Sequence, residues 1–109
     1  DALSDMISEK IKEISMDTIL QKVCHFYDLS PSQILDKTRK ANIAFPRQVG
    51  MYLSNLLITS ISLKDIALYY KRNDHTTVLH AKKMIENRFK EDNELRIEIE
   101  KLIKDIKGI

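Results

Sequence analysis

Five polar side chains of short reach stand close together in the second half of the chain. They are Asp74, His75, Thr76, Thr77 and His80. Their oxygen and nitrogen atoms donate and accept hydrogen bonds near the backbone, as side chains do when they read base edges in the DNA major groove. A solvated helix face would more commonly carry Glu and Lys. These residue types therefore indicate a helix end that contacts bases.

The run that contains these side chains, residues 73–89, has the periodicity of one helix. At ~100° per residue, a polar stripe lies opposite an apolar stripe. The polar stripe consists of Thr76, His80, Lys83 and Asn87, and the apolar stripe of Val78, Ala81, Ile85 and Phe89. We expect the apolar stripe to pack against the protein and the polar stripe to face outward.

The segment SLKDIALYYKRND, residues 62–74, predicts a short amphipathic helix followed by a polar turn of three or four residues. Ser62 and Asp65 resemble a capping box at its start, and Lys64 projects outward. The residues expected to face inward are Ile66, Ala67 and Tyr70. Asn73 is expected to take the left-handed conformation or to cap the next helix. Together the two helices predict a helix-turn-helix.

The composition favours a single all-α domain of six or seven helices. The chain has 109 residues, 43% of them hydrophobic, with only 2 Gly and 2 Pro, whereas a sheet protein needs more turn residues. The formal net charge is only +2. Residues 37–63 hold four Lys or Arg and no acid, and residues 64–90 hold seven Lys or Arg and three acids. The basic charge is therefore central.

The other helices follow from apolar periodicity and capping signals. We expect helices over residues 2–14, 16–27, 31–36, 45–59 and 93–107. Ser15 and Ser30 are the expected N-caps, with Pro31 at a first helical position and Gln33 completing a capping box. Pro46 is expected in the first turn of its helix. The buried faces are predicted as Ile19, Leu20, Val23 and Phe26; Phe45, Val49, Tyr52, Leu53, Leu56 and Leu57; and Leu95, Ile99, Leu102, Ile103 and Ile106.

Residues 37–42, KTRKAN, contain three basic residues and no acid, and they lack apolar periodicity. This pattern predicts an exposed basic loop, which could equally be a solvated charge run. The helix start that follows would offer free backbone N–H groups beside Arg47 and Gln48, and such groups bind phosphate.

Several of these segments together resemble a known family. The string DHTTVLHA, the basic helix after it, the loop at Lys37 to Lys40, and the segments FPRQVGMYL and SLKDIA occur in the order and spacing of the DNA-binding domain of the bacterial replication initiator DnaA. The similarity runs from about Ser15 to Phe89. It implies sequence-specific binding of duplex DnaA boxes at the replication origin.

The resemblance also implies roles for individual residues. Arg39 matches the arginine that enters the minor groove, where A·T-rich DNA attracts basic side chains. The implied major-groove contacts are Asp74, His75, Thr76, Thr77 and His80, and the implied phosphate contacts are Lys37, Lys40, Arg47, Gln48, Lys64, Arg72 and Lys83. The sequence departs from the family pattern at Thr38, Ala41 and Phe45, where basic residues are frequent, at Lys64, often a proline, and at Lys71-Arg72-Asn73, usually glycine-rich before an arginine.

The resemblance implies that residues 1–14 link the domain, residues 15–109, to an upstream motor domain of the same chain. ATP would belong to that motor, because no Gly-rich phosphate loop occurs in these 109 residues, and no other cofactor is expected. The linker is more acidic than basic, which favours a connecting helix over membrane-surface binding. Without an apolar run of ~20 residues, no transmembrane segment is expected. The lone Cys24 indicates a reduced compartment, so we expect the chain in the cytoplasm and nucleoid. We also expect the fragment to be monomeric.

Two other classes of function compete with DNA binding. The apolar stripes of residues 2–14 or 93–107 could dock a partner protein or a membrane, which would make the chain a helical interaction module. An enzyme is not expected, because Cys24 is expected to be buried and the neighbouring His25 solvated, about 100° away on a helix. Metal binding is not expected either, since His75 and His80 lie on different faces with no third ligand.

Overall fold

The computed structural model describes residues 14–109, which fold into six helices. They are α2 (Met16–Tyr27), α3 (Pro31–Ile34), α4 (Ala41–Leu57), α5 (Leu63–Tyr69), α6 (Thr76–Glu91) and α7 (Asn93–Lys107). No strand occurs within this range, so the predicted all-α class with six or seven helices is confirmed. The helix predicted over residues 2–14 lies outside the described residues, apart from Ile14. No helix in the described part is long and apolar enough to cross a membrane.

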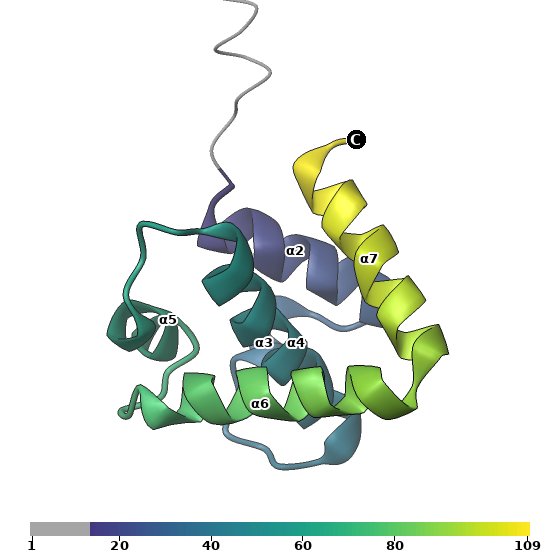
Figure 1. Cartoon of the computed structure of the whole chain (residues 1–109). Helices are drawn as coiled ribbons and strands as arrows, with labels where there is room; N and C mark the ends of the chain where they lie inside the picture. Colours follow the sequence, from purple (N-terminus) through teal and green to yellow (C-terminus); the bar gives the residue numbers. More distant parts are fainter. Residues whose placement is uncertain (1–13) are drawn as a thin grey trace, which may run out of the picture.

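Helix α4 is the centre of the domain, because it packs against α2, α3, α5 and α6. Helix α6 lies across it, with α5 near one end and α7 leaving from the other (Figure 1). Helix α7 then turns away from the end of α6 and packs against α2 (Figure 1). Helix α6, which carries the polar stripe predicted from the sequence, is therefore supported along much of its length by other helices.

Helix α7 closes the core, and its bounds are those expected. Asp92 caps it by accepting a hydrogen bond from the Leu95 backbone N–H at 3.0 Å, and Gly108 ends it in the left-handed region with a φ of 76°. The apolar stripe is buried at Leu95, Ile99, Leu102 and Ile106, and half-buried at Ile103. Because this stripe packs inside the domain, it does not offer the partner-docking face that the interaction-module hypothesis assigned to residues 93–107.

The caps predicted for α2 and α3 are confirmed. The Ser15 hydroxyl accepts from the Thr18 N–H at 3.1 Å, and Ser30 and Gln33 form a reciprocal capping box. Helix α3 ends at Ile34, earlier than the expected end near Asp36. The expected burial of Cys24 and exposure of His25 are confirmed.

Two residues assigned to buried faces are exposed. Phe26 near the end of α2 is 39% exposed and stacks edge-on against Tyr27, and Leu56 near the end of α4 is 46% exposed. The next residues along each helix, Tyr27 and Leu57, are half-buried. Phe26 and Leu56 therefore lie at the edge of their apolar stripes, and helical periodicity does not show how wide the buried part of a stripe is.

The start of α4 differs from the expectation. The helix begins at Ala41, because the Lys40 carbonyl accepts from the Ile43 and Ala44 N–H groups at 3.0 and 2.7 Å. Pro46 therefore lies inside the helix and not in its first turn. The prediction of free backbone N–H groups beside Arg47 and Gln48 is wrong, because both residues are more than one turn from the helix end. The basic loop is correspondingly shorter, ending at Lys40.

The turn between α5 and α6 is also longer than three or four residues. The Ser62 hydroxyl caps α5 by accepting from the Asp65 N–H at 3.1 Å, and Tyr70 is the C-cap. Helix α6 starts only at Thr76, so the residues from 73 to 75 belong to the turn. Asn73 has neither of its two expected roles, because Lys71, with a φ of 58°, takes the left-handed conformation and His75 is the N-cap of α6.

Tyr70 is fully buried beside a glycine of α4. A Cβ atom added at Gly50 would collide with the Tyr70 hydroxyl oxygen and would lie 3.0 Å from its Cζ atom. Within residues 14–109 this hydroxyl has no hydrogen-bond partner. Gly50 therefore allows the end of α5, and with it the turn leading to α6, to approach α4 closely.

Candidate nucleic-acid interface

A groove of about 710 Å³ separates the basic loop, Lys37 to Lys40, from the first turns of α6. Its lining residues are Lys37, Arg39, Ala44, Arg47, Gln48, Lys71, Arg72, Asn73, Thr77 and His80. Five of them are Lys or Arg and none is acidic. A concave surface lined by one sign of charge concentrates the electric field, so this groove attracts a polyanion.

The predicted faces of α6 are confirmed. Thr76, His80, Lys83 and Asn87 are exposed. Val78, Ala81 and Ile85 are at most 1% exposed, and Phe89 is half-buried against Tyr52 of α4. The buried stripe fixes the rotation of α6 about its axis, so that the threonine and histidine side chains point away from the core.

Asp74 caps the start of α6 from the turn. Its Oδ1 atom accepts a hydrogen bond from the Thr76 backbone N–H at 3.0 Å and lies 3.5 Å from His75 Nδ1. The Thr76 N–H holds the pKa of this carboxyl below its usual range, with smaller contributions from the Thr76 hydroxyl and His75. The side chain is exposed, and the other carboxylate oxygen is available as an acceptor for a base.

Arg47 is the one buried cation in the groove, at 5% exposure. Its Nε atom donates to the Ile34 carbonyl at 2.7 Å, Nη1 to the Thr38 carbonyl at 3.1 Å and Nη2 to the Asp36 carbonyl at 2.7 Å. The guanidinium thus binds three carbonyls of the segment that leads from α3 into the basic loop. The phosphate contact expected of Arg47 stays a prediction, since these bonds already occupy three of its five N–H groups.

Arg72 reaches the same segment from the turn before α6. Its Nη2 atom donates to the Asp36 carbonyl at 3.3 Å, so one carbonyl oxygen accepts from two arginines. Burial lowers the pKa of Arg47, the nearby Arg72 charge lowers it further, and Asp36 opposes both effects. Two guanidinium groups held this close repel each other, and a phosphate placed between them would relieve that repulsion.

Comparison with known proteins identifies the family of this chain. The family described as "Bacterial dnaA protein helix-turn-helix" matches residues 16–85, which include the basic loop, α5 and the first part of α6. The chain belongs to this family. It is 42% identical over 107 residues to the chromosomal replication initiator protein DnaA of Caldanaerobacter subterraneus subsp. tengcongensis, covering 98% of the chain and 24% of that protein.

More distant relatives match over almost the same range. The DnaA proteins of Chlorobaculum tepidum and Burkholderia multivorans are each 38% identical, over 104 and 108 residues, and cover 95% and 99% of the chain. These matches amount to 21% and 20% of the two relatives. The chain therefore spans between a fifth and a quarter of the length of the curated relatives it matches.

The remaining predicted contacts of this DnaA helix-turn-helix lie on several elements. Arg39 and Lys40 are exposed in the loop, Lys64 is exposed at the start of α5, and Lys83 is exposed one turn beyond His80. Gln48 is half-buried and lines the groove. Lys40, Lys64, Asp74, His75, Thr76 and Lys83 do not line the groove itself. The structure thus gathers seven of the thirteen predicted residues around one concave surface.

Two polar groove residues were absent from the predicted contacts. Lys71 and Asn73 line the groove because the turn between α5 and α6 is long enough to bring them over it. Their position beside Arg72, in the turn that leads into the helix with the predicted base contacts, is the signal that could have identified them. Among residues 14–109, no three His, Cys, Asp or Glu side chains come together to hold a metal ion.

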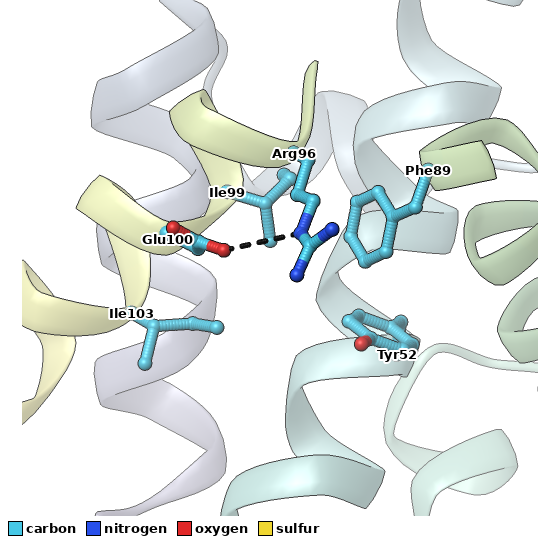
Figure 2. Close-up of a pocket in the computed structure, with 6 residues that line it drawn as sticks. All are labelled: Tyr52, Phe89, Arg96, Ile99, Glu100 and Ile103. Carbon is cyan, nitrogen blue, oxygen red and sulfur yellow. Dashed lines mark hydrogen bonds and ion pairs between the residues drawn. The ribbon is translucent and has the colours of Figure 1, made fainter. Parts of the chain in front are cut away.

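A second cavity of about 310 Å³ lies between α4, α6 and α7 and has a different chemistry (Figure 2). Its lining residues are Tyr52, Phe89, Arg96, Ile99, Glu100 and Ile103. The Arg96 Nε atom donates to Glu100 Oε1 at 3.3 Å, so the two charges of the lining pair with each other. Without an excess of positive charge, this cavity lacks the field that attracts a nucleic acid.

Proposed function

We propose that the chain is the DNA-binding part of a replication initiator and binds DnaA boxes at the replication origin sequence-specifically. The observation that carries the proposal is the groove in which a basic loop faces Thr77 and the exposed His80 of α6. The match to the DnaA family and to relatives named chromosomal replication initiator proteins supports it. The rest of the DnaA chain is the proposed covalent partner, and ATP would bind there.

In this proposal one set of residues contacts bases and another contacts phosphates. Bases would be contacted by Asp74, His75, Thr76, Thr77 and His80 in the major groove and by Arg39 in the minor groove. Phosphates would be contacted by Lys37, Lys40, Gln48, Lys64, Arg72 and Lys83, with Arg47 contributing through its remaining N–H groups. Phosphate contacts fix register and orientation, whereas base contacts carry the sequence information.

The packing of α6 gives a physical basis for separating base contacts from phosphate contacts. The buried apolar stripe of α6 packs on α4, so Thr76 and His80 project from a rigid support. Short side chains on a rigid helix keep a fixed distance from base edges, which is what hydrogen-bond discrimination requires. Long, exposed lysines such as Lys64 and Lys83 adapt to phosphates without that precision.

Fluorescence anisotropy tests the proposal directly. The domain is titrated into a labelled duplex that carries a DnaA box and into a scrambled duplex of equal length and composition, each at two salt concentrations. We expect the box to bind at least ~1000-fold more tightly than the scrambled duplex, and both affinities to fall as salt rises. Equal binding to the two duplexes would contradict sequence-specific recognition.

A further inference from the structure

We propose that Arg47 is a positioning residue, which holds the basic loop in the shape that presents Arg39 to DNA. This proposal rests on the proposed function and deepens it by naming what sets the geometry of the loop. It differs from a direct phosphate contact, because the guanidinium acts on the backbone of its own chain.

The first argument is the hydrogen-bond geometry. The carbonyls of Ile34, Asp36 and Thr38 alternate along the chain and all point at one guanidinium. This segment has no regular secondary structure after Ile34 to satisfy these oxygens. A planar group with five N–H donors in fixed directions matches three separated acceptors, whereas the ammonium of lysine is a single point charge.

The second argument is burial. Arg47 is 5% exposed, yet Arg39, one residue beyond the last carbonyl it binds, is exposed. The loop therefore has a buried anchor and an exposed tip. Removal of the anchor leaves the Ile34 carbonyl without its buried partner, which costs more than loss of a bond at the surface.

The third argument is the link to the recognition helix. The Asp36 carbonyl accepts from both Arg47 of α4 and Arg72 of the turn before α6. This shared acceptor connects the basic loop to the turn before α6, which carries Asp74. The spacing between the minor-groove and major-groove contacts is thereby set within the protein before DNA binds.

Order parameters from ¹⁵N relaxation test the anchor in the free domain, without DNA. We expect Lys37 to Lys40 to have values close to ~0.85, as in the helices, and Arg47→Lys to lower them below ~0.6. Arg88→Lys is the matched control, because Arg88 stacks on the Phe45 ring at 4.5 Å and, within residues 14–109, makes no hydrogen bond to the loop. A mobile wild-type loop, or a loop unchanged by Arg47→Lys, would overturn the proposal.

A double-mutant cycle tests the consequence for binding. In the wild type, Arg39→Ala should weaken binding to a box with an A·T-rich end about tenfold. In the Arg47→Lys background the same change should cost less than about twofold, since Arg39 is no longer held in place. An undiminished effect of Arg39→Ala would contradict positioning.

Salt dependence separates a loss of positioning from a loss of charge. Arg47→Lys keeps the charge, so the slope of log K against log salt should be unchanged for a scrambled duplex.

Ile99→Ala controls for lost stability, because it is a buried change in α7 remote from the loop residues. In this background the cost of Arg39→Ala should stay at about tenfold. If both duplexes bind the wild type equally, the proposed function fails, whereas the order parameters still decide whether Arg47 anchors the loop.

Arg72→Lys provides a second variant that removes one bond to the loop and leaves Arg47 in place. Arg72 is only half-buried, so this variant should fold even if Arg47→Lys is strongly destabilised. We expect a smaller drop in the order parameters of Lys37 to Lys40 than for Arg47→Lys. A larger drop would assign the anchor to Arg72 and would overturn the proposal for Arg47.

Discussion

The polar stripe of α6, which borders the groove at His80, and the basic loop lie on opposite sides of that groove, but different interactions position them. The stripe is placed by a helix whose opposite face is buried at Val78, Ala81 and Ile85. The loop has no regular structure and is tied to the domain by hydrogen bonds from two arginines that lie elsewhere in the sequence. Hydrophobic packing thus orients one half of the interface, and polar contacts to backbone carbonyls orient the other.

This difference affects how substitutions act on each half. A helix face is set by many apolar contacts, so replacing one exposed residue changes one contact with DNA and little else. A loop held by a few hydrogen bonds changes shape when one of them is lost. Effects on the two halves should therefore be separable by stability measurements and by binding measurements.

The largest expected effect comes from the buried face of α6. Ile85→Ala should lower the free energy of unfolding by ~2–5 kcal/mol, because it leaves a cavity in the core. His80→Ala, on the exposed face, should change it by less than ~0.5 kcal/mol while weakening binding to a box by ~1–3 kcal/mol. Urea unfolding followed by circular dichroism, together with anisotropy, measures both; the reverse pattern would exchange the two faces.

The next effect tests the contact that brings the turn before α6 close to α4. Gly50→Ala should destabilise the domain by ~1–3 kcal/mol, since the new Cβ atom collides with the Tyr70 hydroxyl. Tyr70→Phe removes that oxygen, so the double variant should recover part of the loss in a thermal melt. Tyr70→Phe alone should have little effect, and additive losses in the double variant would argue against the collision.

A smaller and opposite effect is expected at Lys71. Its left-handed conformation, with φ at 58°, is unfavourable for a side chain with a Cβ atom, so Lys71→Gly should raise stability by up to ~1 kcal/mol. The same change removes a cation from the groove, and the salt slope for a scrambled duplex should decrease by up to ~1. A loss of stability in chemical unfolding would show that the turn needs the lysine side chain.

The smallest effect concerns the cap of α6. The pKa of Asp74 is lowered in the folded state, so its contribution to stability is present above the unfolded pKa and is lost as pH falls through the folded one. The Thr76 amide resonance should therefore titrate in acid with the Asp74 carboxyl. In Asp74→Asn, which can still cap, this titration should be absent at an otherwise unchanged helix start. A Thr76 amide that titrates in both proteins would exclude the Asp74 cap.

The comparison also explains which parts of the structure could be predicted from the sequence. The two faces of α6 and the bounds of α7 were predictable, because apolar periodicity and terminal caps are local signals. The start of α4 was not, since Pro46 is a common first-turn residue and here lies inside the helix. Exposed Leu56 shows that apolar periodicity does not tell how wide the buried part of a helix face is.

The anchor of the loop was the least predictable feature. Arg47 lies in a basic region, where arginine usually indicates a phosphate contact, but its partners here are backbone carbonyls at Ile34, Asp36 and Thr38. Every residue has a carbonyl group, so such partners leave no pattern in the sequence. The left-handed turn residue was missed for a related reason: Asn73 has the residue type that favours this conformation, whereas the chain path requires it at Lys71.

Base-analogue substitution in the DNA tests most directly the claim that the loop and α6 read different grooves. An inosine·cytosine pair shows the minor groove of A·T and the major groove of G·C, because inosine lacks the guanine amino group. One set of A·T pairs consists of those whose change to G·C no longer lowers the affinity once Arg39 is replaced by Ala. At these pairs we predict that inosine·cytosine leaves the affinity of the wild type nearly unchanged. At A·T pairs whose readout depends on Thr76 or His80, it should weaken binding as much as G·C does. Equal losses for inosine·cytosine and G·C at both sets of positions would contradict minor-groove reading by the loop.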